Sequence, residues 1–159
     1  MSEDSIDHID KGILYLLQEN ARNNTTSAIA EQVDVASSTV GNRIKRLEDR
    51  GVITGYHPSV DYQTAGMSHH VVVVGTVPFD DQRRVADAAT EVDGVVRVRE
   101  LLAGEGNVTV EVIGRSQTEI EERIGALTDL GLDPERVEMV TRETAQPFNH
   151  FGEQFVSDG

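Results

Sequence analysis

The stretch that decides the fold is Thr25–Tyr56, TTSAIAEQVDVASSTVGNRIKRLEDRGVITGY. Thr25 or Thr26 can cap a short helix that runs to Val33, because a hydroxyl oxygen accepts a hydrogen bond from a free N–H of the first turn. Asp34 then lies where the chain has to turn sharply, a position that favours glycine and that aspartate tolerates. The pattern predicts two short helices joined by a tight turn.

The second of these helices is predicted to begin at Ser37 or Ser38 and to end near Arg50, with Gly51 as its C-terminal cap. At about 100° per residue, its apolar residues fall on one face. We expect this face to pack on the preceding helices. Its residues are Val40, Ile44 and Leu47.

The opposite face of this helix is polar and basic in a protein that is strongly acidic. Residues 37–50 contain four basic and two acidic residues, whereas the whole chain has a formal net charge of -14. A positive face on a negative protein is typical of a surface that binds phosphate groups. The alternative is a solvated helix whose basic side chains only pair with Glu48 and Asp49. The residues on this face are Ser38, Thr39, Asn42, Lys45 and Arg46.

We predict that this helix binds DNA and that its side chains have two roles. Some side chains reach base edges in the major groove, whereas others hold phosphates. The predicted base contacts are Ser38, Thr39, Asn42 and Arg46, and the predicted phosphate contacts are Ser37, Arg43 and Lys45.

The composition limits the classes of protein to which the chain can belong. With 159 residues and no cysteine, it can bury a core but has no disulfide, thiolate metal site or cysteine nucleophile. We expect a cytoplasmic protein, because no apolar run is long enough for a membrane span and residues 1–10 are acidic. His69 and His70 are adjacent in a predicted strand and point to opposite faces, which favours a structural or interface role over a metal site. Without a metal cluster, phosphate loop or nucleophile arrangement, we expect neither an enzyme nor a cofactor.

The surplus of acidic residues predicts a surface that stays hydrated in concentrated salt. The chain has 28 acidic and 14 basic residues, and only Lys11 and Lys45 are lysines. We interpret this as adaptation to the cytoplasm of a halophilic archaeon, with an acidic protein from a mesophile as the alternative. Residues 1–60 hold 6 basic and 9 acidic residues, and residues 61–159 hold 8 and 19. Most of the excess therefore lies outside the DNA-binding stretch.

The remaining segments complete a helical domain and add a second domain. An amphipathic helix capped by Asp7 is predicted at Asp7–Gln18, a strand at Val52–Tyr56, and a linker at residues 57–67. Residues 68–144 then predict the order strand, helix, strand, strand, helix, strand, which is that of a ferredoxin-like fold. The predicted elements are 68–77, 80–92, 95–102, 107–113, 116–130 with a capping box of Ser116 and Glu119, and 136–144.

The predicted fold class is therefore α+β, with an N-terminal helix-turn-helix domain of winged-helix type followed by a ferredoxin-like βαββαβ domain. The C-terminal tail contains Phe148, Phe151 and Phe155. Because disordered segments are poor in aromatic residues, we expect the tail to dock on its own or a neighbouring subunit. The predicted boundaries are 1–56 for the helix-turn-helix domain, 57–67 for the linker, 68–144 for the second domain and 145–159 for the tail.

From Asp7 to Thr144 the chain resembles the Lrp/AsnC, or feast/famine, family of transcriptional regulators. The most specific residues are Ile29–Tyr56, IAEQVDVASSTVGNRIKRLEDRGVITGY, followed at a matching spacing by the second domain. The resemblance implies an N-terminal domain that binds double-stranded DNA and a second domain that forms homodimers and higher homo-oligomers. It also implies a small-molecule effector such as an amino acid.

The chain departs from the family pattern in three places. Asp34 occupies a turn position that is often glycine, and Ala36–Ser37 replaces the Ser-Pro that often opens the second helix. The family's effector loop, often Gly-Asp-x-Asp, corresponds here to a stretch that is either a ligand contact or an ordinary hairpin turn. Its residues are Gly104, Glu105, Gly106 and Asn107.

Two hypotheses for the whole chain follow. The first is a sequence-specific transcription regulator that is at least a dimer, since one small helix binds one half-site weakly and a dimer links two such contacts. The second is an effector-sensing oligomeric protein whose helix-turn-helix contacts another protein. Binding to the DNA upstream of its own gene distinguishes them.

Overall fold

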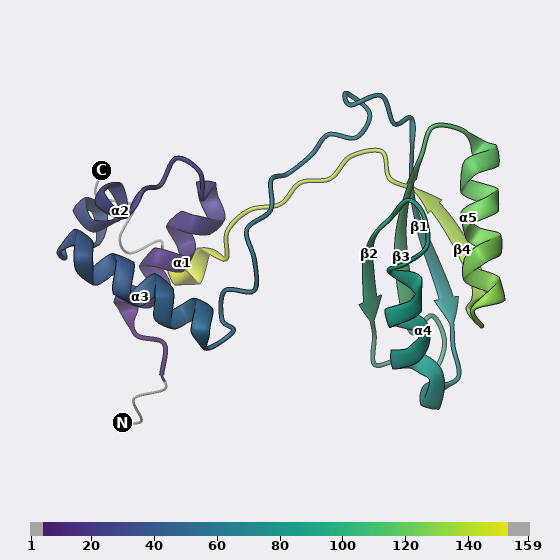
Figure 1. Cartoon of the computed structure of the whole chain (residues 1–159), viewed down its shortest axis with the longest axis horizontal. Coiled ribbons are helices and arrows are strands. Elements are labelled where there is room, and N and C mark those ends of the chain that lie inside the picture. The colour runs from purple at the N-terminus through teal and green to yellow at the C-terminus, as the bar shows by residue number, and fades with distance from the viewer. Residues whose placement is uncertain (1–4, 153–159) are drawn as a thin grey trace. The chain divides into compact units, whose positions relative to one another are not determined.

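The structure, a computed structural model, describes residues 5–152 of the chain (Figure 1). The chain forms two compact units. Of the described residues, the first unit contains 5–58 together with 144–152, and the second unit contains 59–143. The C-terminal part of the chain thus belongs to the same unit as the N-terminal helices.

Three helices form the first unit, and side chains cap two of them. At the first helix, the Asp10 N–H donates to Asp7 Oδ1 at 2.9 Å and the Asp7 N–H donates to Asp10 Oδ2 at 3.3 Å. At the second helix, Thr25 accepts a hydrogen bond from the Ala28 N–H at 3.2 Å. These caps confirm the predicted starts of both helices. The helices are α1 (His8–Asn20), α2 (Thr26–Val33) and α3 (Ser37–Asp49).

The chain makes sharp turns before and after α3. Asp34 adopts the left-handed conformation, with φ 55° and ψ 52°. Gly51 does the same with φ 72°, and its N–H donates to the Glu48 carbonyl at 2.9 Å while the Val52 N–H donates to the Leu47 carbonyl at 2.9 Å. This pair of hydrogen bonds is a Schellman motif. The predicted turn at Asp34 and the predicted cap at Gly51 are confirmed.

The core of the first unit lies where the apolar face of α3 packs on α1 and α2. Val40 and Leu47 are fully buried, and Ile44 is partly buried against them. This confirms the predicted apolar face. Burying a large apolar side chain contributes about 1.5–3 kcal/mol, so these contacts hold α3 with its other face outward.

The predicted strand at Val52–Tyr56 is wrong. The described residues of the first unit contain no strand, and the chain after α3 continues as a turn, a bend and a segment without regular secondary structure. A strand needs a partner for its backbone hydrogen bonds, and the three helices offer none. Instead, the Ile53 N–H donates to the Leu47 carbonyl at 3.1 Å and the Ile53 side chain packs against the helical core.

The C-terminal tail packs on the first unit. A short 3-10 helix, η2 (Asn149–Phe151), places Phe151 against the helical core. Phe148 meets Phe151 edge to face, with ring centroids 4.9 Å apart. A Cβ atom at Gly152 would clash with the ring of Tyr15, so the backbone itself lies against α1. This confirms docking of the tail on its own chain for residues 148–152, while Phe155 lies outside the described residues.

Replacing Phe151 with alanine is expected to lower the free energy of unfolding of the first unit by about 1–2 kcal/mol, because the side chain is partly buried against its core. Thermal unfolding followed by circular dichroism measures the change. Phe79→Ala is the control, since Phe79 is 74% exposed in the second unit. Equal effects of the two substitutions would show that the tail adds no stability to the helices.

The second unit is a four-stranded antiparallel sheet with the strand order β2-β3-β1-β4 and two helices. This order and topology are those of the predicted ferredoxin-like fold, and the elements can be followed in Figure 1. They are β1 (His69–Thr76), the 3-10 turn η1 (Phe79–Asp81), α4 (Gln82–Ala89), β2 (Val95–Glu100), β3 (Val108–Gly114), α5 (Gln117–Asp129) and β4 (Asp133–Met139).

Both helices cover one face of this sheet. Alternate valines of β1 and β3 form a buried cluster with side chains from α4 and α5. Because successive residues of a strand point to opposite faces, the residues between these valines lie on the face without helices. The cluster includes Val71, Val73, Val108, Val110, Val112, Val85, Ala89, Ile120 and Leu127.

The cap of α5 and the bounds of the last strand differ from the prediction. At α5, Ser116 accepts a hydrogen bond from the Glu119 N–H at 3.2 Å, but the Glu119 carboxylate accepts from the Arg115 N–H at 2.8 Å. Only the Ser116 half of the predicted capping box is therefore formed. The Glu119 carboxylate binds the backbone N–H and the side chain of Arg115 instead of the Ser116 N–H. The last strand is Asp133–Met139 rather than 136–144, since its length is set by pairing with β1.

Candidate nucleic-acid interface

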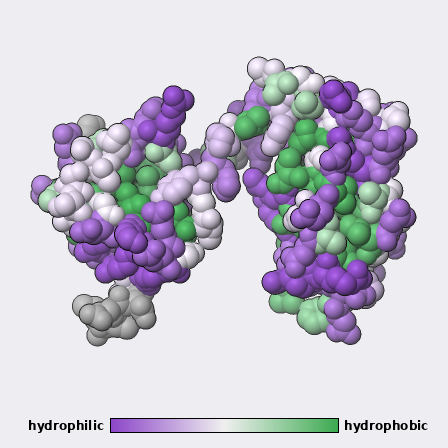
Figure 2. All heavy atoms as spheres, viewed as in Figure 1, coloured by the Kyte–Doolittle hydropathy of each residue, from purple (hydrophilic) through white to green (hydrophobic). Residues whose placement is uncertain are grey.

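The outward face of α3 brings the predicted DNA contacts together on one surface. Ser37, Ser38, Asn42, Lys45 and Arg46 are exposed. Thr39 and Arg43 are partly buried. Hydrophilic residues gather on the side of the first unit where α3 lies (Figure 2). The face therefore carries hydroxyl, amide, ammonium and guanidinium groups, which are the donors and acceptors that read base edges and hold phosphates.

The N-terminus of α3 adds backbone donors to this surface. Ala36 occupies the cap position and supplies no side-chain hydrogen bond, whereas the Thr39 N–H donates to the Ala36 carbonyl at 3.0 Å. The N–H groups of Ser37 and Ser38 precede the first intrahelical bond, and such groups favour an anion. Because Ala36–Ser37 replaces the Ser-Pro that often opens this helix, no side chain at the cap position binds the N–H groups at the N-terminus of α3.

The basic side chains of α3 are paired with acids. Arg43 Nη1 lies 2.5 Å from Asp7 Oδ2 and 3.2 Å from Asp10 Oδ1. Arg46 Nη2 lies 3.4 Å from Asp10 Oδ2. Of these three side chains, only Lys45 pairs with an acid of its own helix, as expected for a solvated helix. Its Nζ lies 3.2 Å from Asp49 Oδ2, one turn later in α3.

Exposure separates these three cations. The side chain of Lys45 is 75% exposed, that of Arg46 is 46% exposed and that of Arg43 is only 23% exposed. Lys45 and Arg46 are thus accessible to a ligand, whereas Arg43 is held between α3 and the start of α1. The predicted phosphate contact of Arg43 stays a prediction.

Arg43 and Asp7 stay ionised because each stabilises the charge of the other. Burial raises the pKa of the Asp7 carboxyl, but hydrogen bonds from the Arg43 guanidinium and the Asp10 N–H outweigh it and leave the pKa below its usual value. The hydrogen bond to Asp7 raises the pKa of Arg43. An acid with a lowered pKa stabilises the fold above its ordinary pKa of about 4 and loses this contribution as the pH falls through the folded-state value. At neutral pH the pair fastens α3 to α1.

The predicted effector loop is a tightly bonded turn between β2 and β3. Asn107 is 3% exposed; its Oδ1 accepts from the Val77 N–H at 2.9 Å and its Nδ2 donates to the Val77 carbonyl at 2.8 Å. The Gly106 N–H donates to Thr76 Oγ1 at 2.8 Å. Gly104 and Glu105 are exposed. The side chain of Asn107 is therefore engaged by the fold, and the open part of the loop is Gly104–Glu105.

Replacing Asn107 with aspartate is expected to destabilise the second unit by about 1–3 kcal/mol, because a carboxylate cannot donate to the buried Val77 carbonyl. Chemical denaturation measures the loss. Glu105→Gln is the control in the same loop, since Glu105 is exposed. An Asn107→Asp protein as stable as the wild type would show that the amide pair with Val77 adds nothing.

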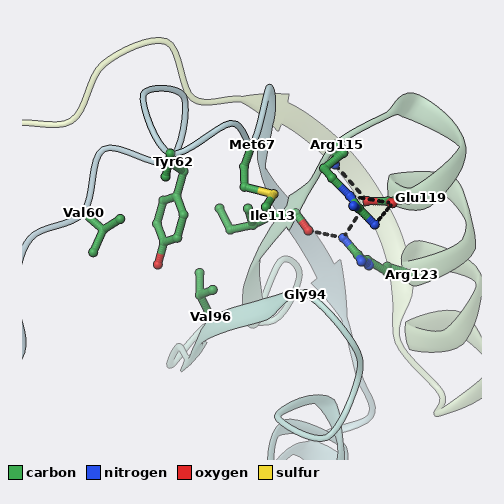
Figure 3. A pocket seen from close by; sticks show the side chains of 10 residues that line it. Val60, Tyr62, Met67, Gly94, Val96, Ile113, Arg115, Glu119 and Arg123 are labelled. Atoms are coloured by element: carbon green, nitrogen blue, oxygen red, sulfur yellow. Dashed lines mark hydrogen bonds and ion pairs between the residues drawn. The ribbon is translucent and has the colours of Figure 1, made fainter.

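A cavity of about 450 Å³ lies at the opposite end of the sheet from this loop. Val60, Tyr62, Met67, Val96 and Ile113 point into a common space, and an ion-paired group stands beside them (Figure 3). In that group, Glu119 pairs with both Arg115 and Arg123, at 3.2 and 3.5 Å. The cavity does not include Gly104–Asn107. The sequence carried no signal for it, because its lining comes from four separate segments.

His70 has the structural role that the sequence favoured. Its Nε2 lies 2.8 Å from Glu111 Oε1, and Arg97 and Arg99 approach the same carboxylate at 3.4 and 3.6 Å. His69 contacts Ser68 instead. Within residues 5–152, no cluster of three or more histidine, cysteine, aspartate or glutamate side chains could hold a metal ion. None of the helices in this range has the length and apolar character needed to span a bilayer.

The described geometry defines a class of protein. A tight turn joins α2 to α3, α3 packs by its apolar face, and its polar face is left exposed, which is the arrangement of a helix-turn-helix DNA-binding protein. Residues 6–54 match the family model of winged helix-turn-helix DNA-binding domains.

Known proteins extend this similarity over the second unit. The chain is 31% identical over 129 residues to the HTH-type transcriptional regulator LrpB of Bacillus subtilis, covering 79% of this chain and 83% of LrpB. It is 39% identical over 61 residues to the HTH-type transcriptional regulator Ptr1 of Methanocaldococcus jannaschii, covering 38% of this chain and 40% of Ptr1. A transcriptional regulator of Neisseria meningitidis, solved in complex with L-Met, shares the fold with a TM-score of 0.73 at 21% identity, covering 91% of this chain and 95% of that one. The chain belongs to the Lrp/AsnC family of transcriptional regulators.

Proposed function

We propose that this protein regulates transcription by inserting α3 into the major groove of double-stranded DNA. The observation that carries the proposal is the outward face of α3, which exposes Ser38, Asn42 and Arg46 on a helix fixed by its buried side. Base edges are contacted by Ser38, Thr39, Asn42 and Arg46. Phosphates are held by Ser37, Lys45 and Arg43. Arg43 is paired at the same time with Asp7 and Asp10.

The proposed function is tested on DNA from upstream of the protein's own gene. A fluorescence anisotropy titration compares a fragment of this region, the operator, with a scrambled fragment of equal length and composition. The expected result is tighter binding to the operator in the same potassium chloride concentration. Equal binding to both fragments, or to neither, would favour the alternative that the helix-turn-helix contacts a protein.

The binding unit is a homodimer, and dimers assemble further through the second unit. A two-fold dimer presents two copies of α3 to two half-sites, which links their binding free energies. Support comes from two apolar residues beside the cavity of Figure 3: Val60, in the segment before β1, is 49% exposed, and Val96, in β2, is 46% exposed. Analytical ultracentrifugation over a range of protein concentrations measures the state.

A small molecule such as an amino acid modulates the DNA binding. Support comes from the similarity to the Neisseria regulator solved with L-Met and from the exposed backbone of Gly104–Glu105. The ligand contacts are assigned to Gly104, Glu105 and Gly106, whereas the Asn107 side chain is occupied by Val77. Isothermal titration of each of the common amino acids tests this assignment.

The protein works in the cytoplasm of a halophilic archaeon. Its 28 acidic and 14 basic residues support this setting. In concentrated salt, the release of counterions contributes little to DNA affinity, because its driving force falls with the logarithm of the salt concentration. Recognition then depends mainly on direct contacts with bases and on the shape of the DNA.

A further inference from the structure

A buried carboxylate lies directly behind the proposed DNA-binding face. Asp10, in the first turn of α1, is 0% exposed. A buried charge is stable only when it is paired and hydrogen-bonded. Asp10 Oδ1 lies 3.2 Å from Arg43 Nη1, and Asp10 Oδ2 lies 3.4 Å from Arg46 Nη2 and accepts from the Asp7 N–H at 3.3 Å. Asp10 therefore connects the start of α1 to the arginines of α3.

The two arginines depend on Asp10 to different degrees. Arg43 has a second acid, Asp7, at 2.5 Å and is only 23% exposed. For Arg46, Asp10 is the acid partner within 4.0 Å among residues 5–152, and the Arg46 side chain is 46% exposed. Asp7 can thus neutralise the charge of Arg43. The charge of Asp10 is then available to pair with Arg46.

This pairing has two consequences for Arg46. A guanidinium has five N–H donors in a fixed plane, so one edge can bind Asp10 while the others stay available for a base. The Arg46 side chain then loses its conformational entropy when the protein folds rather than when it binds DNA. The carboxylate also offsets the positive charge of Arg46, which reduces its attraction to phosphates of any sequence.

We propose that Asp10 is a positioning residue that determines DNA specificity by orienting Arg46 and offsetting its charge. The inference rests on the proposed function, since it assigns Asp10 a role in the same DNA-binding face. A carboxylate that only holds α1 against α3 would affect the stability of the first unit without changing the preference for one DNA sequence over another.

The substitution Asp10→Asn tests this role. Asparagine has nearly the same shape, its Oδ1 can still accept from the Asp7 N–H, and Asp7 still pairs with Arg43. The measurements are the affinities for the operator and the scrambled fragment between 0.1 and 1 M potassium chloride. We expect the ratio of operator to scrambled affinity to fall about 5- to 10-fold. We also expect the plot of log affinity against log salt to steepen by about 0.9, the contribution of one additional phosphate contact.

Asp49→Asn is the matched control. It removes the same charge from a pair with Lys45 on the exposed side of α3. This variant is expected to bind both fragments more tightly and to keep their ratio within about 2-fold, because a phosphate contact carries no sequence information. A ratio that falls equally in both variants would overturn the inference, since any lost acid would then have the same effect.

A double-mutant cycle with Arg46→Gln shows whether Asp10 acts through Arg46. In the Arg46→Gln background, Asp10→Asn is expected to leave the affinity ratio unchanged. If Asp10→Asn fails to fold, Arg46→Lys tests the same pairing, because a single ammonium cannot bind Asp10 and a base edge in the manner of a planar guanidinium. Arg46→Lys is expected to keep the scrambled affinity and to lower the operator affinity about 10-fold.

The outcomes separate the inference from the proposed function. A wild-type protein without a preference for the operator overturns both. A wild-type preference that Asp10→Asn and Arg46→Lys leave intact overturns the role of Asp10 alone. A fall in the ratio for Asp10→Asn that persists in the Arg46→Gln background also overturns it, because Asp10 would then act through another residue.

Discussion

Replacing Arg46 with alanine is expected to weaken operator binding about 5- to 150-fold, the equivalent of about 1–3 kcal/mol for one good contact with a base. Binding to scrambled DNA should fall much less. The side chain is 46% exposed on the outward face of α3, and arginine is well suited to bind the O6 and N7 atoms of guanine with two hydrogen bonds. The fold should survive the change, because the buried Asp10 carboxylate still pairs with Arg43, at 3.2 Å.

Two variants serve as controls for Arg46→Ala. Lys45→Ala removes a cation predicted to hold a phosphate, so it should weaken binding to both DNA fragments by similar factors. Arg22→Ala removes the same charge from an exposed position between α1 and α2 and should have little effect on either fragment. Anisotropy titrations of all variants at one salt concentration give the comparison. Equal losses on both fragments for Arg46→Ala would assign Arg46 to the phosphate contacts.

The helices of the first unit could be predicted because their signals are local. Asp7 and Thr25 cap the helices that follow them, and Asp34 and Gly51 adopt the left-handed conformation where the chain has to turn. Each signal depends on neighbours within a few residues of the chain. The apolar spacing then predicted which face of α3 packs inward.

The contacts of Asp10 could not be predicted from the same sequence. Asp10 lies in the first turn of α1, whereas its partner Arg43 lies 33 positions later. Helical periodicity fixes the face of each helix but not the height at which two helices cross. The pairing of their charged side chains depends on that height. The basic residues of α3 can therefore be identified from the sequence, but the acids behind them cannot.

Other features that could not be predicted from the sequence have the same origin. The residues Val52–Tyr56 have the composition of a strand, but the described residues of the first unit contain no partner strand for them. The sequence of Gly104–Asn107 is compatible with a ligand contact or with an ordinary hairpin turn, and it does not reveal that the Asn107 side chain binds Val77, 30 positions earlier. The aromatic tail was predicted to dock, but only the structure gives its contact, the ring of Tyr15. In each case the missing information is a long-range contact.

Raising potassium chloride from 0.1 to 2 M is expected to raise the melting temperature of the protein by at least about 5 °C, which corresponds to roughly 2 kcal/mol at this chain length. The second unit, residues 59–143, carries 17 acidic and 8 basic residues. The Debye length is about 10 Å at 0.1 M salt and about 3 Å at 1 M, so repulsion among these acids is largely screened at the higher concentration.

Salt also screens favourable pairs, and their strengths decide the sign of the effect. Surface ion pairs such as Arg136–Glu138 and Arg83–Glu100 are exposed and contribute little individually, whereas repulsion acts among all the unpaired acids together. A variant with Glu122→Gln and Asp129→Asn, two exposed acids of α5, should therefore melt at a higher temperature than the wild type in 0.1 M salt and gain less from 2 M salt. Sucrose, which stabilises folded proteins by exclusion rather than by screening, should raise both melting temperatures equally. A wild-type melting temperature that falls with added salt would show that the ion pairs outweigh the repulsion and would contradict adaptation to a saline cytoplasm.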